Sequence, residues 1–155
     1  MNPRVESVTR SLRAAGVVAQ VRVLPENAHT AVLAAEQLGI EVGAIANSLI
    51  FDAGGAPLLV MTSGSHRVDT AKVAALLGVP TLRRADPDFV RLHTGQAIGG
   101  VAPVGHPAPI GTLVDIELAR HDEIWAAAGH PSTVFATTYA ELLRITSGTA
   151  AEVGD

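Results

Sequence analysis

A chain of 155 residues suits a single domain, because a second hydrophobic core would leave each half too small. Apolar residues make up 48% of the chain and charged residues 17%, which excludes intrinsic disorder. The formal net charge of -4 lacks the basic excess of a dedicated nucleic-acid binder, and the lack of cysteine excludes disulfides, thiolate catalysis and cysteine-ligated zinc.

The amino terminus predicts neither export nor membrane insertion. The residues from Met1 to Arg4 do not begin the apolar region of a signal peptide, and no apolar run approaches the roughly 20 residues that span a bilayer. We therefore expect a cytoplasmic protein without a membrane partner.

The first part of the chain predicts helices around one strand. A capping asparagine and a proline begin a helix over 2–16, and alternating apolar positions over 17–23 indicate a strand. A threonine cap and a closing glycine bound a second helix over 30–39. A short helical segment over 42–46 is expected to end at Asn47.

The middle of the chain predicts a hairpin followed by two helices. Apolar runs at 49–51 and 58–61 flank an Asp-Ala-Gly-Gly turn at 52–55, which favours antiparallel pairing. Aspartate caps begin helices over 69–78 and 86–93, the second with proline at its first helical position.

The last third begins with a stretch that is not regular helix. Five glycines and three prolines lie within 95–111, so we expect an ordered loop with short strands. A strand around Val114, a helical stretch around Trp125 and a strand over 133–135 follow. A Thr-x-x-Glu capping box then begins a final helix over 138–148, with a glycine as its end.

Together these elements predict an α/β (α+β) fold with a mixed, partly antiparallel sheet rather than a doubly wound parallel one. No G-x-G-x-x-G follows a strand, so a dinucleotide-binding fold is excluded. We expect one domain over 1–148 and a frayed tail over 149–155.

The histidines and serines predict no metal site and no Ser-His-Asp triad. No two histidines form an H-x-H or H-x-x-x-H pair. Ser63 and His66 follow a strand, but G-x-S-x-G is absent, and turn formation explains them better. The six histidines are His29, His66, His93, His106, His121 and His130.

The glycine-rich run from Gly95 to Gly105 is the most unusual segment. Exposed backbone N–H groups around Gly99 and Gly100 could bind a phosphate or a developing oxyanion, and a plain structural turn is an equal alternative. His130 follows a glycine before a strand, where it could act as a donor or as an exposed loop residue.

Three blocks of sequence, in this order, resemble the YbaK family, which includes the editing domain inserted in bacterial prolyl-tRNA synthetases. The GxxxGGVxPxG loop between the other two blocks is the most specific of them. The matching residues are Thr30, Ala31, Ala34, Ala35, Leu38, Gly39 and 45–51; Arg67, Val68, Asp69 and Lys72; then Gly95, Gly99, Gly100, Val101, Pro103, Gly105, Gly129 and His130.

This resemblance implies a sheet curled toward an open barrel, surrounding helices and a pocket for the aminoacyl end of tRNA. It also implies hydrolysis of the ester of a mischarged tRNA of the proline type, by a water or the terminal ribose hydroxyl, without metal or other cofactor. The implied partners are aminoacyl-tRNA and an aminoacyl-tRNA synthetase, and not DNA. The implied site comprises Asn47, Gly99, Gly100 and His130 as catalytic residues; Thr30, Ser48, Ser63, Val101, Pro103 and Gly129 against the substrate; and Arg67 and Lys72 near the tRNA.

The sequence departs from this family at Asn47, where a lysine is usual. A neutral amide can orient a substrate but cannot neutralise a phosphate or a developing negative charge. Three functions therefore stay open: a deacylase that works without the lysine, a binding module that kept the pocket, and a hydrolase of a small ester unrelated to tRNA.

Overall fold

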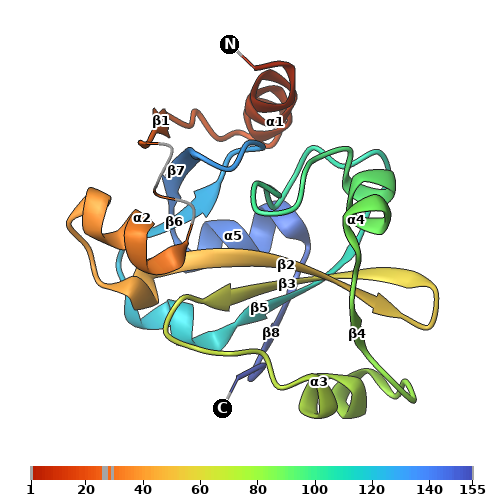
Figure 1. Cartoon of the computed structure of the whole chain (residues 1–155). Helices are drawn as coiled ribbons and strands as arrows, with labels where there is room; N and C mark the ends of the chain where they lie inside the picture. Colours follow the sequence, from red (N-terminus) through yellow and green to blue (C-terminus); the bar gives the residue numbers. More distant parts are fainter. Residues whose placement is uncertain (1, 26–27, 29, 155) are drawn as a thin grey trace.

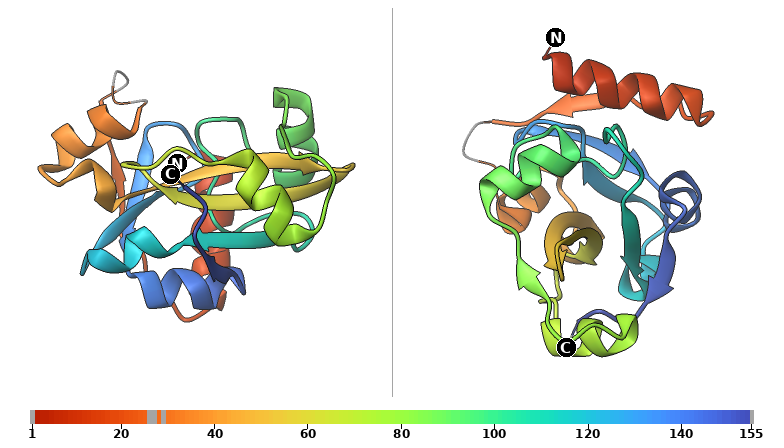
Figure 2. Two further views of the ribbon diagram at one scale, coloured as in Figure 1. Left: turned by 90° about the horizontal axis from the view of Figure 1, so that it is seen from below. Right: turned by 90° about the vertical axis from the view of Figure 1, so that its right-hand side faces the viewer.

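The protein folds around one mixed sheet of eight strands, which curls without closing (Figures 1 and 2). The computed structural model describes residues 2–25, 28 and 30–154. Seven strands follow the order β1-β7-β6-β2-β3-β5-β8, and β4 pairs with β2 beside this path. The predicted fold class is confirmed: parallel and antiparallel pairs occur in the same sheet, and helices lie around it.

Local signals set the helix ends as expected. In all five α-helices the capping side chain accepts a hydrogen bond from a backbone N–H in the first turn, as Asn2 does from Arg4 at 2.8 Å. None of the described helices is long and apolar enough to cross a membrane. The α-helices are α1 (Pro3–Ala14), α2 (Ala31–Leu38), α3 (Thr70–Leu77), α4 (Pro87–Thr94) and α5 (Tyr139–Thr146).

The predicted hairpin forms the centre of the sheet. Its turn is tightened by Asp52, whose carboxylate accepts a hydrogen bond from the N–H of Gly55. The strands are β1 (Val21–Val23), β2 (Ile45–Ala53), β3 (Ala56–Ser63), β4 (Arg83–Arg84), β5 (Gly111–Asp115), β6 (Ile124–Ala127), β7 (Thr133–Thr137) and β8 (Thr149–Ala151), with 3-10 turns η1 (Val42–Ala44) and η2 (Ile116–Arg120).

One edge of β2 is only partly paired. β3 pairs along the whole opposite edge, so β6 and β4 must share the remaining one. β6 pairs there with Ile45 and Ala46, and β4 pairs with Phe51 and Asp52. The edge at 47–49 is therefore an opening in the sheet between β6 and β4.

The alternation of β2 explains why Asn47 is exposed at this opening. Ala46 and Ile50 face the largest core cluster, whereas Ile45 packs in the cluster under α2 and Phe51 in the cluster under α3. Asn47 shares the face of Ile45 and Phe51 but lies between the two helix-covered clusters.

The helical stretch predicted around Trp125 is wrong. Trp125 lies in β6, where it pairs with Ala136 of β7 and Ile45 of β2. The helical turn comes earlier, as η2. The alanines after Trp125 favour helix locally, but strand pairing on both sides outweighs a helix propensity of tenths of a kcal/mol per residue.

Several other helices and strands begin or end at residues different from those predicted. The strand expected over 17–23 is limited to β1, and the segment 95–110 contains no strand. The helical segment expected over 42–46 is the single turn η1, so Asn47 lies inside β2. The last helix ends at Thr146 and is capped by Ser147, whose φ is 51°, one residue before the predicted glycine.

The expected frayed tail is also wrong, because β8 within 149–155 pairs in parallel with β5. Val153 is fully buried, and the N–H of Asp69 donates to its carbonyl. A strand of three residues is too short to give a periodic pattern in the sequence. Pairing with β5 is what makes this segment a strand.

Candidate functional site

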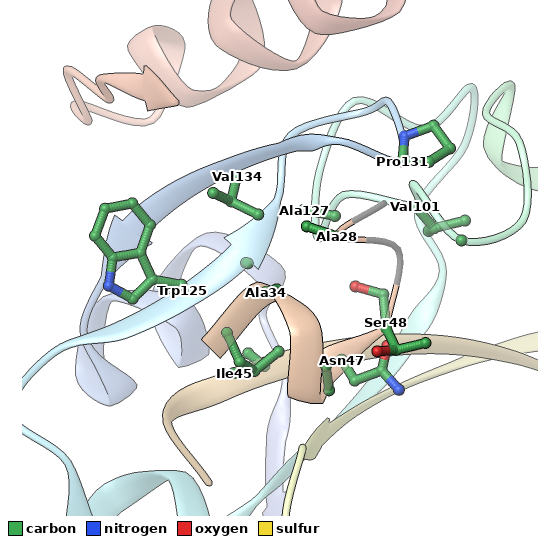
Figure 3. A pocket seen from close by; sticks show the side chains of 15 residues that line it. Ala28, Ala34, Ile45, Asn47, Ser48, Val101, Trp125, Ala127, Pro131 and Val134 are labelled. Carbon is green, nitrogen blue, oxygen red and sulfur yellow. The ribbon is translucent and has the colours of Figure 1, made fainter. Parts of the chain in front are cut away.

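A small cavity opens beside β2, in the gap left by β6 and β4. Its volume is about 60 Å³, and alanine side chains form much of its wall. Figure 3 shows Asn47 and Ser48 at one end and Trp125 and Val134 at the other. The lining residues are Ala28, Thr30, Ala31, Ala34, 45–48, Gly99, Val101, 125–127, Pro131 and Val134.

A second cavity of about 120 Å³ adjoins the first. Its further walls come from β4 and α4 and include Arg84 and Val90. The residues common to both cavities are Asn47, Ser48, Gly99 and Val101. A ligand with two unlike ends could therefore cross this boundary, with its central bond beside Asn47 and the glycine loop.

Gly100 brings two loops that are distant in sequence into backbone contact. A Cβ on this residue would lie 2.6 Å from both the carbonyl carbon of His130 and the nitrogen of Pro131. No side chain can rotate away to relieve such a contact, because both atoms belong to backbone. Gly100 thus fixes the glycine loop against the turn at His130.

The backbone N–H groups of the glycine loop are not equivalent. The N–H of Gly100 donates to the carbonyl of Ala97 at 3.0 Å. Within the described residues, the N–H groups of Gly99 and Val101 have no backbone or side-chain acceptor, and both residues line the cavities. Gly99 and Val101, rather than Gly100, thus offer donors for a ligand.

Buried polar side chains behind this loop hold it in place. Gln96, only 2% exposed, accepts from the N–H of Ala102 at 2.7 Å and donates to the carbonyl of Val104 at 3.2 Å. His106 Nε2 lies 2.8 Å from the carbonyl oxygen of Ala102. Burial lowers the pKa of His106, against the opposing effect of this backbone hydrogen bond, so the neutral ring is favoured.

Helix α1 supports both loops from outside. A Cβ on Gly105 would lie 3.2 Å from Val8 Cγ2, and one on Gly129 would lie 3.0 Å from the same atom. Val8 is fully buried. One side chain of α1 thus touches the glycine loop and the turn that carries His130.

His130 lies next to the site but does not line either cavity. Its backbone forms a turn with Thr133, whose hydroxyl accepts from the His130 N–H and donates to the His130 carbonyl. Pro131, its neighbour, lines the first cavity. The contact with Gly100 brings His130 and the glycine loop together, and the catalytic roles that the resemblance implies for them stay a prediction.

The structure divides the predicted substrate-binding residues into two groups. Thr30, Ser48 and Val101 line the first cavity. Ser63 is fully buried and donates to the carbonyl of Gly43, Pro103 is buried behind the loop, and Gly129 is packed against α1. These three do not line the first or the second cavity, because each serves a packing or turn role.

The predicted tRNA-binding residues also lie away from the cavities. Lys72 is on α3, and its ammonium donates to Glu152 at 3.2 Å and to the carbonyl of Gly154 at 3.0 Å. Arg67 is exposed in the loop before α3. Arg84 and Trp125 line the site although sequence reasoning missed them; the Arg83-Arg84 pair was a signal for the former.

Ser63 and His66 show why a strand-end serine is not a nucleophile here. Asp115, fully buried, accepts from the Ser63 N–H at 3.0 Å and lies 2.9 Å from His66 Nδ1. An acid partner for His66 therefore exists. The Ser63 hydroxyl, however, contacts Gly43 and Ser65, so no Ser-His-Asp chain is completed among these residues.

The described residues contain no group of three His, Asp or Glu side chains suited to a metal ion. His29 lies outside the described residues. The cavities offer an amide, hydroxyls, one guanidinium and backbone N–H groups. This donor set can bind and polarise a carbonyl or a phosphate without a metal.

Comparison with known proteins gives this geometry a family context. Residues 25–145 match the model of the aminoacyl-tRNA editing domain. YwhH of Bacillus subtilis, an uncharacterized protein, is 31% identical over 110 residues, which span 70% of this chain and 69% of YwhH. The proline–tRNA ligase of Nitratidesulfovibrio vulgaris (strain DP4) is 31% identical over 91 residues, 59% of this chain but only 16% of the ligase.

Solved structures share the whole fold. A structure described as "a putative trans-editing enzyme for prolyl tRNA synthetase" has a TM-score of 0.95 and 39% identity, covering 100% of this chain and 99% of the other. The hypothetical protein APE2540 has a TM-score of 0.86 and 27% identity over 96% of this chain and 99% of its own. The resemblance drawn from the sequence is confirmed.

Proposed function

Because the chain belongs to the aminoacyl-tRNA editing domain family, we propose that it is a trans-acting deacylase for mischarged tRNA of the proline type. The observation that carries this proposal is the pair of cavities that meet at Asn47, Ser48, Gly99 and Val101. An aminoacyl ester joins two unlike groups, an amino acid and a nucleoside, and the two cavities match these two ends.

The first cavity favours a small amino acid. Its volume of about 60 Å³ accommodates a few water molecules or a short side chain. Alanines form its walls, and Ile45 and Val134 close the space that a longer side chain would need. The Thr30 hydroxyl accepts from the N–H of Leu33 and the Ser48 hydroxyl donates to Met61 Sδ, so each keeps a lone pair that can accept from the ammonium group of the amino acid.

Ester hydrolysis in this site needs stabilisation of the oxyanion. Water adds to the ester carbonyl carbon and releases a proton to solvent, and negative charge collects on the carbonyl oxygen. The carbonyl then re-forms, the bond to the ribose oxygen breaks, and the ribose oxygen takes up a proton from solvent. The free N–H groups of Gly99 and Val101 are suited to donate to the charged oxygen. One such donor is typically worth about 2.7 to 4 kcal/mol in the transition state.

Asn47 has a more limited role than a lysine would have. Its amide can hold the ester carbonyl or the ribose by hydrogen bonds, but it brings no charge. Arg84, in the second cavity, is the charged group that can meet a phosphate of the terminal nucleotide. We propose that Arg84 takes over part of the electrostatic role usually assigned to lysine.

The tRNA and any synthetase would form a wider complex around this site. A tRNA for proline is the proposed substrate, and a synthetase that releases it is a candidate partner, consistent with the sequence match to proline–tRNA ligases. A cytoplasmic location follows from this role and stays a prediction.

The competing proposal is a binding module without turnover, which the change from lysine to Asn47 favours. The test is release of labelled amino acid from alanyl-, cysteinyl- and seryl-tRNA for proline. Wild type should release at least one of them, and Asn47→Ala and His130→Ala should slow the release by at least tenfold. Leu76→Ala, on the exposed face of α3, serves as the control and should retain the wild-type rate.

Two outcomes separate the proposals. If wild type releases no amino acid from the panel and Asn47→Lys does, the binding module is correct. If wild type is active and Asn47→Lys changes the rate only modestly, the deacylase works with the amide as it stands.

A further inference from the structure

The charges of this chain are distributed unevenly along the sequence. The first 23 residues contain Arg4, Arg10, Arg13 and Arg22 against Glu6 alone, a net charge of +3. Because the whole chain carries -4, the remaining residues carry -7. On formal charge, the amino-terminal segment is therefore the part of the chain that favours contact with a polyanion such as RNA.

Helix α1 displays this positive charge at the surface. Arg4, Arg10 and Arg13 are exposed, and none of them takes part in an ion pair among the described residues. By contrast, Lys72, Arg91 and Arg120 lie within 4 Å of Glu152, Asp88 and Glu117. Among the described residues, α1 therefore carries more arginines without an ion pair than any other helix or strand.

One side of α1 borders a groove that is free of carboxylates. Arg4, Ser7 and Ser11 recur at helical spacing and line a cavity of about 430 Å³ between α1 and the segment that surrounds the glycine loop. The opposite wall comprises 94–96 and 105–107, which include no acidic residue. A guanidinium and two hydroxyls on one face suit phosphate oxygens.

The glycine loop connects the groove to the candidate active site, although the groove shares no lining residue with either cavity. Gln96 lines the groove and also binds the glycine loop through Ala102 and Val104. Val8 of α1 contacts the positions of Gly105 and Gly129, and the Arg4 carbonyl lies 3.0 Å from a Cβ placed on Gly129. Figure 1 shows α1 beside the loop that follows α4. A duplex lying on α1 would thus be adjacent to the loops that hold the ester.

We propose that α1 is the surface that binds the phosphate backbone of the RNA acceptor arm. The identity of this RNA as tRNA rests on the proposed function. Arg4, with Ser7 and Ser11, binds phosphates nearest the active site, and Arg10 and Arg13 bind phosphates farther along the helix. These contacts position the stem without reading its sequence.

The test measures binding and catalysis separately. Binding of uncharged tRNA is followed by fluorescence anisotropy between 50 and 200 mM salt for wild type, Arg10→Gln, the triple variant Arg4→Gln/Arg10→Gln/Arg13→Gln, and the control Arg120→Gln. Glutamine keeps a similar helix propensity, and circular dichroism verifies folding. Hydrolysis is measured on mischarged tRNA and on aminoacyl-adenosine, which has no acceptor stem.

The triple variant should bind tRNA roughly tenfold more weakly, and its salt slope should fall by about one for each lost phosphate contact. Arg10→Gln should show a smaller effect in the same direction, Arg120→Gln should match wild type, and aminoacyl-adenosine should be hydrolysed at the same rate by all. Equal tRNA affinity of wild type and the triple variant, or no tRNA binding by wild type at 50 mM salt, overturns the inference.

The two proposals fail in different ways. If wild type hydrolyses no ester, and the triple variant binds tRNA more weakly than wild type does, the deacylase function is wrong and the proposed RNA-binding surface on α1 is correct. If wild type deacylates tRNA and the triple variant does so with unchanged KM, the function stands and the surface is wrong.

Discussion

Gly100 is the residue on which the geometry of the candidate site depends most directly. Its φ is ordinary, so the requirement for glycine comes from the closeness of the His130–Pro131 peptide rather than from backbone conformation. Gly99, by contrast, has a φ of 90° and open space around it. Adjacent glycines thus meet two separate physical requirements.

Gly100→Ala is expected to destabilise the protein by about 2 to 3 kcal/mol and to abolish deacylation, because the added methyl forces the two loops apart. Urea unfolding and single-turnover hydrolysis measure the two effects. Gly111→Ala is the matched control: this glycine has ordinary φ and no neighbour within 4 Å, so its free energy of unfolding should change by less than about 0.5 kcal/mol. Equal unfolding midpoints for the two variants would contradict the proposed contact.

Asn47 is the second residue on which the candidate site depends. It lies on the unpaired part of the β2 edge, between the residues that pair with β6 and those that pair with β4. Any side chain at this position is presented to both cavities. The change from lysine to asparagine therefore removes a positive charge from the site and shortens the side chain that lines both cavities.

At the scale of elements, β8 has the least local support and a clear tertiary role. It adds a parallel strand to β5, and the residues after it are tied to α3 by Lys72 and by the Val153 carbonyl. Val153 packs in the cluster that includes Phe51 and Val73. The carboxyl-terminal segment thus closes the core under α3.

Val153→Ala is expected to lower the free energy of unfolding by about 2 kcal/mol, because two buried methyl groups are lost and a cavity is left. Urea unfolding monitored by circular dichroism measures the change. Val18→Ala provides the comparison, since Val18 is 84% exposed and its truncation should have little effect. A Val153 variant as stable as the Val18 variant would show that the segment is frayed after all.

At the scale of the whole molecule, the titration of His106 links stability to pH. Burial lowers its pKa below the usual value of 6.5, so the unfolded chain binds this proton more readily than the folded one. Between the lowered pKa and about 6.5, stability therefore falls as pH falls. The loss levels off below the folded-state pKa.

His106→Gln removes this titration, so the variant should lose less stability than wild type between pH 7.5 and 5.5. Urea unfolding midpoints at several pH values give the pH dependence of stability for each protein. Titratable groups other than His106 contribute equally to both, so their contributions cancel in the difference. An equal loss in both proteins would show that His106 is protonated equally well in the folded and unfolded chains.

The sequence alone predicted the features that depend on neighbouring residues. The five helix caps, the central hairpin and the irregular glycine-rich segment were all predicted, because capping and turn formation act within a few residues. The resemblance supplied the family and the residues Asn47, Gly99 and Val101, which do line the cavities. The single-domain boundaries and the residue roles stay predictions.

Tertiary structure decided what local signals cannot determine. Trp125 lies in a strand and Thr149–Ala151 form another because of partners distant in the sequence, β2 and β5. Likewise, the Gly100 N–H is taken by Ala97, Ser63 is turned toward Gly43, and Arg84 reaches the second cavity. The physical reason is that burial, strand pairing and the availability of a donor depend on how distant segments converge, whereas a helix cap depends only on its own turn.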